Sequence, residues 1–344
     1  MLLADEGSQM NQQKRPGEEI SESNYLNRRD ILKGLGYGAA GLTALSVPGF
    51  LRGMNQSFDL ASLGLDDEEI KEAFKPAIGD LHSDLFPAGR SKAYSIAPRT
   101  LTEEKIASTY NNFYEFTTVK NRVWQMAKGF KATPWKIDVG GAVEKEFTLD
   151  LDDLIKLAPL EERTYRFRCV ETWAMQVPWT GYPLSKLIDR CKPLGKAKYI
   201  KFVTILDKDR LPGQSDPQWP WPYFEALRLD EARHNLAMVC VGIFGHALPM
   251  QFGAPWRVIV PWKYGYKSPK SIVRIEFTEK KPSTFWNSAI PNEYGFFSNV
   301  DPSKPHPRWS QAMERDIGTG KRRPTLLYNG YADEVASLYK GDEH

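Results

Sequence analysis

Cysteine is scarce in this 344-residue chain, and its pattern excludes several kinds of site. The three cysteines, Cys169, Cys191 and Cys240, form no C-x-x-C pair, which argues against a zinc ribbon, a thioredoxin-type site or a disulfide scaffold. Because three is an odd number, at least one thiol has no partner within the chain. The sequence also has no C-x-x-C-H haem motif and no iron–sulfur motif, so electrons for any redox reaction must come from outside.

An excess of charge of one sign is missing as well. The chain has 46 Lys and Arg against 43 Asp and Glu, a net charge of +3, which argues against a dedicated nucleic-acid binder. Its 41% hydrophobic residues can form a core and exclude wholesale disorder. The length predicts one large or two ordinary domains, and 12% aromatic residues with 24 prolines indicate many loops and a broad pocket.

The first 47 residues have the pattern of an export signal. Arg28 and Arg29 precede a weakly apolar stretch at 34–47, which Pro48 closes. Paired arginines before such a stretch are typical of twin-arginine signals, and the stretch is short for a membrane span. Asn27 and Ile31 depart from the commonest residues there, and no A-x-A cleavage site is visible. The alternative is a surface helix with a chance arginine pair.

Because twin-arginine export carries folded proteins, often with a cofactor, the leader predicts a cofactor enzyme located in the periplasm. We expect residues 1–47 to be this signal and residues 48–344 to form a single catalytic domain. No second long apolar run follows the leader, so we expect no membrane span beyond it.

The remaining sequence predicts many strands and few, short helices. Alternation and apolar runs indicate strands at 135–139, 147–149, 164–169, 199–206, 236–244, 256–261 and 272–277. Helices are expected at 66–74, 100–108, 151–157 and 183–191. Thr100 and Glu103 form a capping-box pattern, and Asp150 can cap the third helix. This order indicates an α+β fold of mixed sheets with short helices and long loops.

The three cysteines differ in their surroundings. Cys191 lies on the apolar stripe of an expected helix and Cys240 in an apolar strand, so both are predicted to be core thiols. Cys169 follows Arg166 and Arg168, and positive neighbours favour the thiolate that binds metals. No nearby His or second Cys completes a zinc or iron site, so a metal there would need other ligands, such as a dithiolene. A redox-sensing thiol is the alternative.

Residues 168–181 (RCVETWAMQVPWTG) resemble the metal-binding segment of the sulfite-oxidase superfamily of molybdopterin enzymes. Within that superfamily the similarity is greatest to the periplasmic protein-methionine-sulfoxide reductases. Further motifs agree in the same order along about residues 75–340: 110–116 (YNNFYEF), 253–257 (GAPWR), 260–267 (VPWKYGYK), 293–296, 306–311 and 323–330.

The resemblance implies one Mo-molybdopterin per chain, with Cys169 as the thiolate ligand of the metal. It further implies pterin contacts from Asn111, Tyr114, Glu115 and Thr204, and a phosphate site made by Arg257 and the segment Ser268, Pro269, Lys270. Cationic side chains beside a loop suit a phosphate, although any one of them alone could be a surface charge. Phe252 stands where the resemblance places a pterin-contacting Asn, so that contact must be lost or taken up by a neighbour.

Glu171 is the second candidate catalytic residue. It lies two residues after Cys169, hence on the same face if the strand continues. It could orient a metal-bound water or carry a proton; a structural hydrogen bond is the alternative. Aromatic residues that could form the floor of a substrate pocket, or simply pack in the core, are Trp173, Trp179, Trp219, Trp221 and Tyr223.

The function implied is reduction of methionine sulfoxide in oxidised periplasmic proteins by oxygen-atom transfer. A membrane haem-binding, quinone-linked subunit (MsrQ-like) would supply electrons, the twin-arginine machinery would export the chain, and no nucleic acid is expected.

The alternatives are a sulfite dehydrogenase, another S- or N-oxide reductase, and a non-catalytic binding protein. A sulfite dehydrogenase usually adds a dimerisation domain of about a hundred residues, whereas roughly sixty follow residue 281. A non-catalytic relative should lack Cys169, Arg257 and Lys270, and all three are present.

Overall fold

The computed structural model describes residues 67–95 and 100–341. The expected twin-arginine signal and the boundary after residue 47 lie outside these residues. Within the described ranges, no helix has the length and apolar character needed to cross a membrane.

The larger sheet contains the longest strand of the described chain. Its eight strands among the described residues are β1 (Gly89–Ser95), β4 (Glu161–Arg168), β5 (Trp173–Pro183), β8 (Met238–Ile243), β9 (His246–Ala247), β10 (Arg257–Ile259), β12 (Met313–Asp316) and β13 (Arg322–Pro324). The path runs β1-β4-β5-β12-β13, and β8 pairs with β5, β9 and β10. Strands β4 and β5 form an antiparallel hairpin whose last pair before the turn is Arg168 and Ala174.

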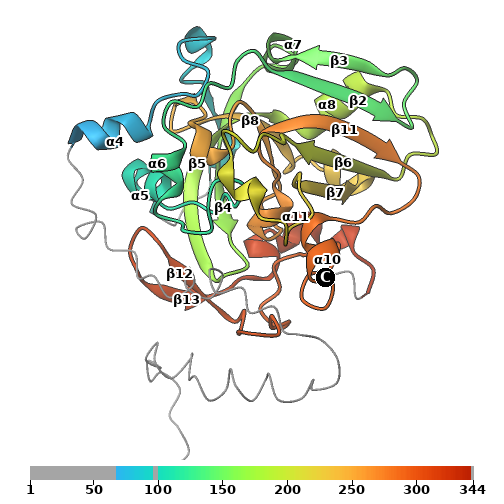
Figure 1. The fold of residues 1–344 in the computed structure, drawn as a ribbon. Coiled ribbons are helices and arrows are strands. Elements are labelled where there is room, and N and C mark those ends of the chain that lie inside the picture. Colours follow the sequence, from blue (N-terminus) through green and yellow to red (C-terminus); the bar gives the residue numbers. More distant parts are fainter. Residues whose placement is uncertain (1–66, 96–99, 342–344) are drawn as a thin grey trace, which may run out of the picture. The chain divides into compact units, whose positions relative to one another are not determined.

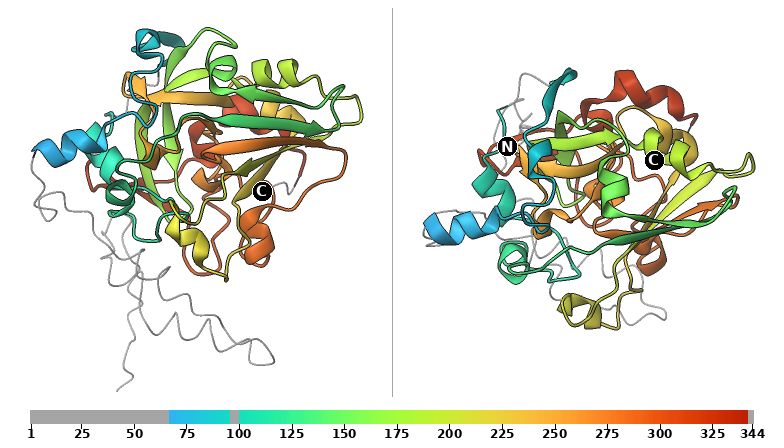
Figure 2. Two further views of the ribbon diagram at one scale, coloured as in Figure 1. Left: turned by 45° about the horizontal axis from the view of Figure 1, so that its top comes forward. Right: turned by 90° about the horizontal axis from the view of Figure 1, so that it is seen from above.

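The smaller sheet lies beside β4, β5 and β8 (Figures 1 and 2). Within the described residues it has five strands in the order β3-β2-β11-β6-β7. They are β2 (Lys136–Gly141), β3 (Phe147–Asp150), β6 (Tyr199–Thr204), β7 (Phe224–Arg228) and β11 (Ile272–Thr278). Alternate residues of β6 are buried, as expected for a strand with one face on the core.

All helices in the described part are short. They are α4 (Asp67–Ala73), α5 (Glu104–Thr109), α6 (Val123–Met126), α7 (Leu151–Ile155), α8 (Leu184–Cys191), α9 (Leu229–Arg233), α10 (Phe285–Ala289) and α11 (Ala332–Val335). Single 3₁₀ turns are η2 (Ser83–Leu85), η3 (Pro212–Ser215), η4 (Met250–Phe252), η5 (Gly265–Lys267), η6 (Leu327–Gly330) and η7 (Ala336–Leu338). Mixed sheets with few, short helices confirm the predicted α+β class.

Local sequence signals located most of the expected elements. Asp150 caps α7 as predicted, because its side chain accepts a hydrogen bond of 2.8 Å from the Asp153 backbone N–H. The capping-box prediction was wrong. Helix α5 begins at Glu104 without a side-chain cap, because the Thr102 backbone pairs with the Gln176 carbonyl at the edge of β5 instead.

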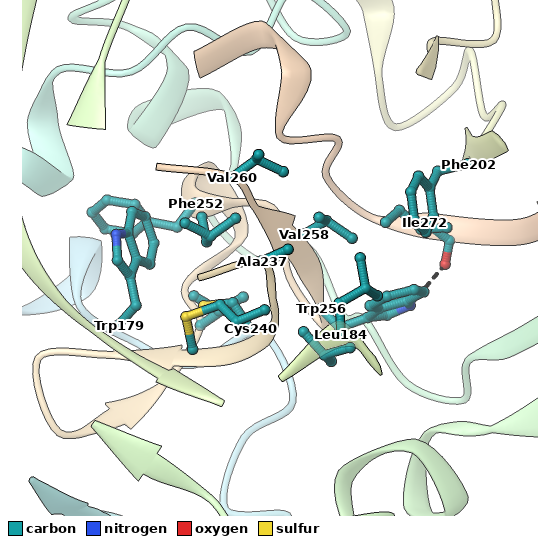
Figure 3. Packing of buried hydrophobic residues seen from close by; sticks show 14 of the residues in the cluster. Trp179, Leu184, Phe202, Ala237, Cys240, Phe252, Trp256, Val258, Val260 and Ile272 are labelled. Atoms are coloured by element: carbon teal, nitrogen blue, oxygen red, sulfur yellow. Dashed lines mark hydrogen bonds between the residues drawn. The ribbon is translucent and has the colours of Figure 1, made fainter. Parts of the chain in front are cut away.

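The core confirms the prediction for two cysteines. Cys191 lies on the buried stripe of α8, and Cys240 is fully buried in β8. Figure 3 shows Cys240 among Ala237, Val258 and other apolar side chains, with the indole of Trp256 donating to the Ile272 carbonyl. All three cysteines have free thiols and are buried.

Candidate functional site

A cavity of about 920 Å³, including its open mouth, lies where loops from both sheets meet. The larger sheet contributes the turn between β4 and β5, and the smaller sheet contributes Tyr223, just before β7, and the segment that leads into β11. The rest of the lining comes from the 111–115 segment (without Phe113), turn η4, Arg257 of β10, helix α10 and Tyr294 after that helix.

Cys169 begins the turn between β4 and β5. Its backbone N–H donates to the Trp173 carbonyl (2.9 Å), and its carbonyl accepts from Thr172 (3.1 Å). Thr172 has a φ of 70°, a left-handed conformation that reverses the chain. The predicted strand therefore does not continue past Arg168, yet the turn still brings Glu171 to Cys169, with Sγ 3.6 Å from Oε2.

The neighbouring arginines were expected to lower the pKa of the Cys169 thiol, but other effects outweigh them. Burial and the Glu171 carboxylate raise the pKa of the Cys169 thiol to about 12, although Lys120 and Arg168 act in the opposite direction. Arg168 is fully buried and pairs with Glu314 at 3.3 Å. Bound metal would displace the proton, since metals bind the thiolate form.

Glu171 is held by side chains from three segments. Lys120, itself 1% exposed, lies 3.0 Å from Oε2. Asn112 donates to the same oxygen (2.8 Å) and also to the Cys169 thiol (3.2 Å). The Trp173 indole N–H and the Tyr114 hydroxyl approach the carboxylate at 3.4 and 3.5 Å. Burial lowers the pKa of Lys120, but the charges of Glu171, Tyr110 and Cys169 and the hydrogen bond to Glu171 together outweigh burial, so the pKa is raised.

Two cations, the buried Arg257 and the half-buried Lys270, line another part of the cavity. Arg257 donates to the carbonyls of Phe252 (2.9 Å) and Ser268 (3.0 Å), and Lys270 donates to the Asn112 carbonyl (2.7 Å). Burial lowers the pKa of Arg257 to about 10; burial and the Arg257 charge lower the pKa of Lys270 to about 8. The charge of buried Glu115 partly offsets the lowering of the Lys270 pKa. Burial raises the pKa of the Glu115 carboxyl. The arrangement favours an anion between the cations.

Several polar atoms beside this cavity lack a partner. In the part of the chain that the structure describes, Asn111 Oδ1, Asn112 Oδ1, Thr204 Oγ1 and Arg257 Nε are buried without a hydrogen bond. Such atoms are costly unless a ligand satisfies them. Together with a thiol for a soft metal and two cations for a phosphate, they fit the predicted molybdopterin cofactor. Over 67–95 and 100–341, no three His, Cys, Asp or Glu side chains gather as a metal site of their own.

The structure brings most of the predicted site residues to this cavity. Asn111, Tyr114, Glu115, Cys169, Glu171, Phe252, Arg257, Ser268, Pro269 and Lys270 all line it. Thr204 does not; it ends β6, where its backbone N–H donates to the carbonyl of the lining residue Tyr223 (2.9 Å). Phe252 supplies its carbonyl to Arg257 and packs its ring against Trp179, with centroids 6.0 Å apart (Figure 3).

The aromatic candidates separate into two groups. Trp173 and Tyr223 line the cavity, whereas Trp179 is fully buried in the core and Trp219 and Trp221 pack behind Phe285. Sequence reasoning missed Asn112, Lys120, Phe285, Trp286 and Tyr294. Asn112 and Tyr294 lie within the quoted motifs 110–116 and 293–296 and could have been found there. The other three carry no local signal, because long-range folding alone places them at the site.

Comparison with known proteins identifies the class to which the chain belongs. Residues 124–286 match the family model described as the oxidoreductase molybdopterin-binding domain. The chain is therefore an oxidoreductase with a molybdopterin-binding fold, as the motifs predicted. A solved structure, the sulfane dehydrogenase SoxCD from Paracoccus pantotrophus, matches 84% of this chain and 67% of its own with 14% identity and a TM-score of 0.44.

Curated relatives define the family more closely. Each is named protein-methionine-sulfoxide reductase catalytic subunit MsrP. The protein from Ralstonia nicotianae is 56% identical over 68% of this chain and 73% of its own length. Those from Burkholderia mallei and Campylobacter jejuni are each 52% identical, over 72% and 70% of this chain and 76% and 81% of their own lengths. The chain belongs to the MsrP family, which confirms the resemblance seen in its motifs.

Proposed function

We propose that the chain is a periplasmic, molybdenum-dependent reductase that converts methionine sulfoxide in proteins back to methionine. The observation that carries the proposal is the placement of the buried Cys169 thiol, the buried Arg257 guanidinium and the half-buried Lys270 ammonium around one cavity. The names of the relatives support the choice of substrate.

Cys169 would be the protein ligand of molybdenum. Asn111, Tyr114 and Glu115 would contact the pterin, with Thr204 adding a contact through the end of β6. Arg257, Ser268, Pro269 and Lys270 would hold the terminal phosphate, and Phe252 would close the cavity where the resemblance places an Asn. When bound, molybdopterin supplies a metal that accepts an oxygen atom from the sulfoxide and passes on two electrons.

Glu171 would donate protons beside the reacting centre. Its side chain is 3% exposed, and four donors fix the position of the carboxylate next to Cys169. We assign it the delivery of protons, through Oε1 or Oε2, to the oxygen removed from the sulfoxide. Sulfoxide, two electrons and two protons then yield thioether and water, so the balance closes.

The electrons would come from a membrane haem-binding, quinone-linked subunit of the MsrQ type. The absence of haem and iron–sulfur motifs from the sequence supports an external donor. The arginine pair at 28–29 and the apolar stretch after it support export by the twin-arginine machinery. Oxidised periplasmic proteins would be the substrates.

Activity of the cofactor-loaded protein tests the proposal directly. We expect it to reduce methionine sulfoxide in an oxidised protein with a reduced dye as donor, and not to oxidise sulfite at a comparable rate. The parallel sulfite assay is the control, because a sulfite dehydrogenase is the alternative that uses the same cofactor. Rapid sulfite oxidation without sulfoxide reduction would contradict the proposal.

A further inference from the structure

Three aromatic rings form one side of the cavity, and we call them the aromatic wall: Tyr114, Trp286 and Tyr294. The Trp286 ring is central, with centroids 5.6 Å from Tyr114 and 5.0 Å from Tyr294. The three residues lie in separate segments of the chain. Tyr114 precedes α6, Trp286 lies in α10, and Tyr294 follows that helix.

The wall is held from behind by further rings. Trp219 meets Trp286 edge-on at 5.1 Å and stacks on Phe285 at 6.0 Å, with planes 21° apart. The Asn287 side chain donates to the Tyr294 carbonyl (2.8 Å), which closes the loop after α10. Edge-to-face packing of buried rings fixes their orientation, so the wall is a preformed surface.

The wall borders the turn that carries Cys169 and Glu171. The Tyr114 hydroxyl lies 3.5 Å from Glu171 Oε1, so the aromatic wall contacts the carboxylate through Tyr114. The Trp173 indole and the Asn112 amide donate to the other side of that carboxylate. The cavity therefore presents an apolar surface next to a cluster of polar donors.

We propose that the aromatic wall is the subsite for the S-methyl group and the side-chain methylenes of the sulfoxide. The inference rests on the proposed function and specifies how its substrate is chosen. A methionine sulfoxide side chain is apolar except at one strongly dipolar S–O bond. Its carbon atoms gain by contact with aromatic rings, while the oxygen is directed toward the Cys169 turn. In this arrangement the Trp286 ring would limit the size of the S-alkyl group.

A pair of substrates that differ by one methylene tests the wall. We would measure kcat/KM of the cofactor-loaded enzyme for N-acetylmethionine sulfoxide and N-acetylethionine sulfoxide. In Trp286→Ala, the ratio of ethyl to methyl substrate should rise about tenfold, because one methylene in an apolar pocket changes selectivity by that order. Trp286→Phe should show a smaller rise, and it keeps the test valid if the alanine variant fails to fold.

Trp221→Ala is the matched control. Its ring packs 5.0 Å from Phe285 in the same aromatic cluster but does not line the cavity. A general loss of packing would lower both rates in this variant and leave the ratio unchanged. If the wild-type enzyme is active and both Trp286 variants keep the wild-type ratio, the wall is not the subsite. If the wild-type enzyme reduces neither these substrates nor methionine sulfoxide in an oxidised protein, the proposed function falls as well.

Discussion

Arg257 and Lys270 show how single residues prepare this cavity for a ligand. Arg257 is 2% exposed, and its Nη atoms donate only to backbone carbonyls. In the described residues no carboxylate pairs with it, and its Nε has no partner. A buried charge without a counter-charge costs stability. A buried positive charge such as Arg257 beside Lys270 is therefore expected only where a bound anion offsets that cost.

His306 gives a prediction for stability at the residue scale. Its ring stacks on Trp309 with centroids 3.6 Å apart, and Trp309 in turn donates to the Val170 carbonyl in the Cys169 turn. Burial and the charge of Arg308 lower the pKa of His306 to about 3, although the Glu293 carboxylate lies 3.5 Å from its Nε2. Between its ordinary pKa and this value, the unfolded chain binds a proton that the folded chain does not, so acid favours unfolding.

We therefore expect His306→Phe, which keeps the stacked ring, to reduce the acid sensitivity of the protein. Between pH 7 and pH 5 the wild type should lose about 2 kcal/mol more unfolding free energy than the variant. Urea unfolding at the two pH values measures the difference. Equal losses in both proteins would show that His306 titrates normally in the folded state.

Strand β5 is the element that positions the site, because the Cys169 turn leads into it and β8 packs along its far end. The β5–β8 pairing shifts register between Thr180 and Gly181. Gly181 allows this close approach: a Cβ atom there would lie 1.8 Å from the Val239 carbonyl oxygen. Backbone contact of this kind cannot be relieved by a side-chain rotation.

Gly181→Ala should consequently destabilise the protein by about 3 kcal/mol, since the two strands must separate locally. Gly195→Ala is the matched control, because a Cβ atom at Gly195 would meet no atom within 4 Å. Its effect should stay within about 0.5 kcal/mol. Chemical denaturation of the two variants measures both values. A small loss in Gly181→Ala would mean that the β5–β8 pairing is looser than the structure indicates.

At the same scale, the sequence predicted elements with clear periodicity and missed those without it. The buried stripe of α8 and the strands β6, β8 and β11 followed from apolar patterns. Strand β5 was not predicted. All but its last residue are buried, so it shows no alternation, and it contains Pro178 and Gly181. Helix α5 starts late because pairing of Thr102 with Gln176 overrides a local capping pattern.

At the scale of the whole molecule, the site is made by loops that only the complete fold brings together. The motifs pointed to Cys169 and to the residues that we propose hold the phosphate, and the structure places all of them around one cavity. They could not predict that Lys120 would pair with Glu171, 51 positions away, or that α10 would contribute the aromatic wall. Such contacts depend on how the two sheets pack, and no local periodicity encodes that.

The central claim is that Cys169 is the protein ligand of molybdenum. X-ray absorption at the molybdenum edge of purified, cofactor-loaded protein tests it most directly, because it counts the sulfur atoms around the metal. We compare the wild type, Cys169→Ser and Cys191→Ala; the last removes a buried thiol of α8 that does not line the cavity. Cys169→Ser should show one sulfur ligand fewer than wild type, or no bound molybdenum, whereas Cys191→Ala should match the wild type. An unchanged sulfur count in Cys169→Ser, or a wild type without molybdenum, would contradict the account.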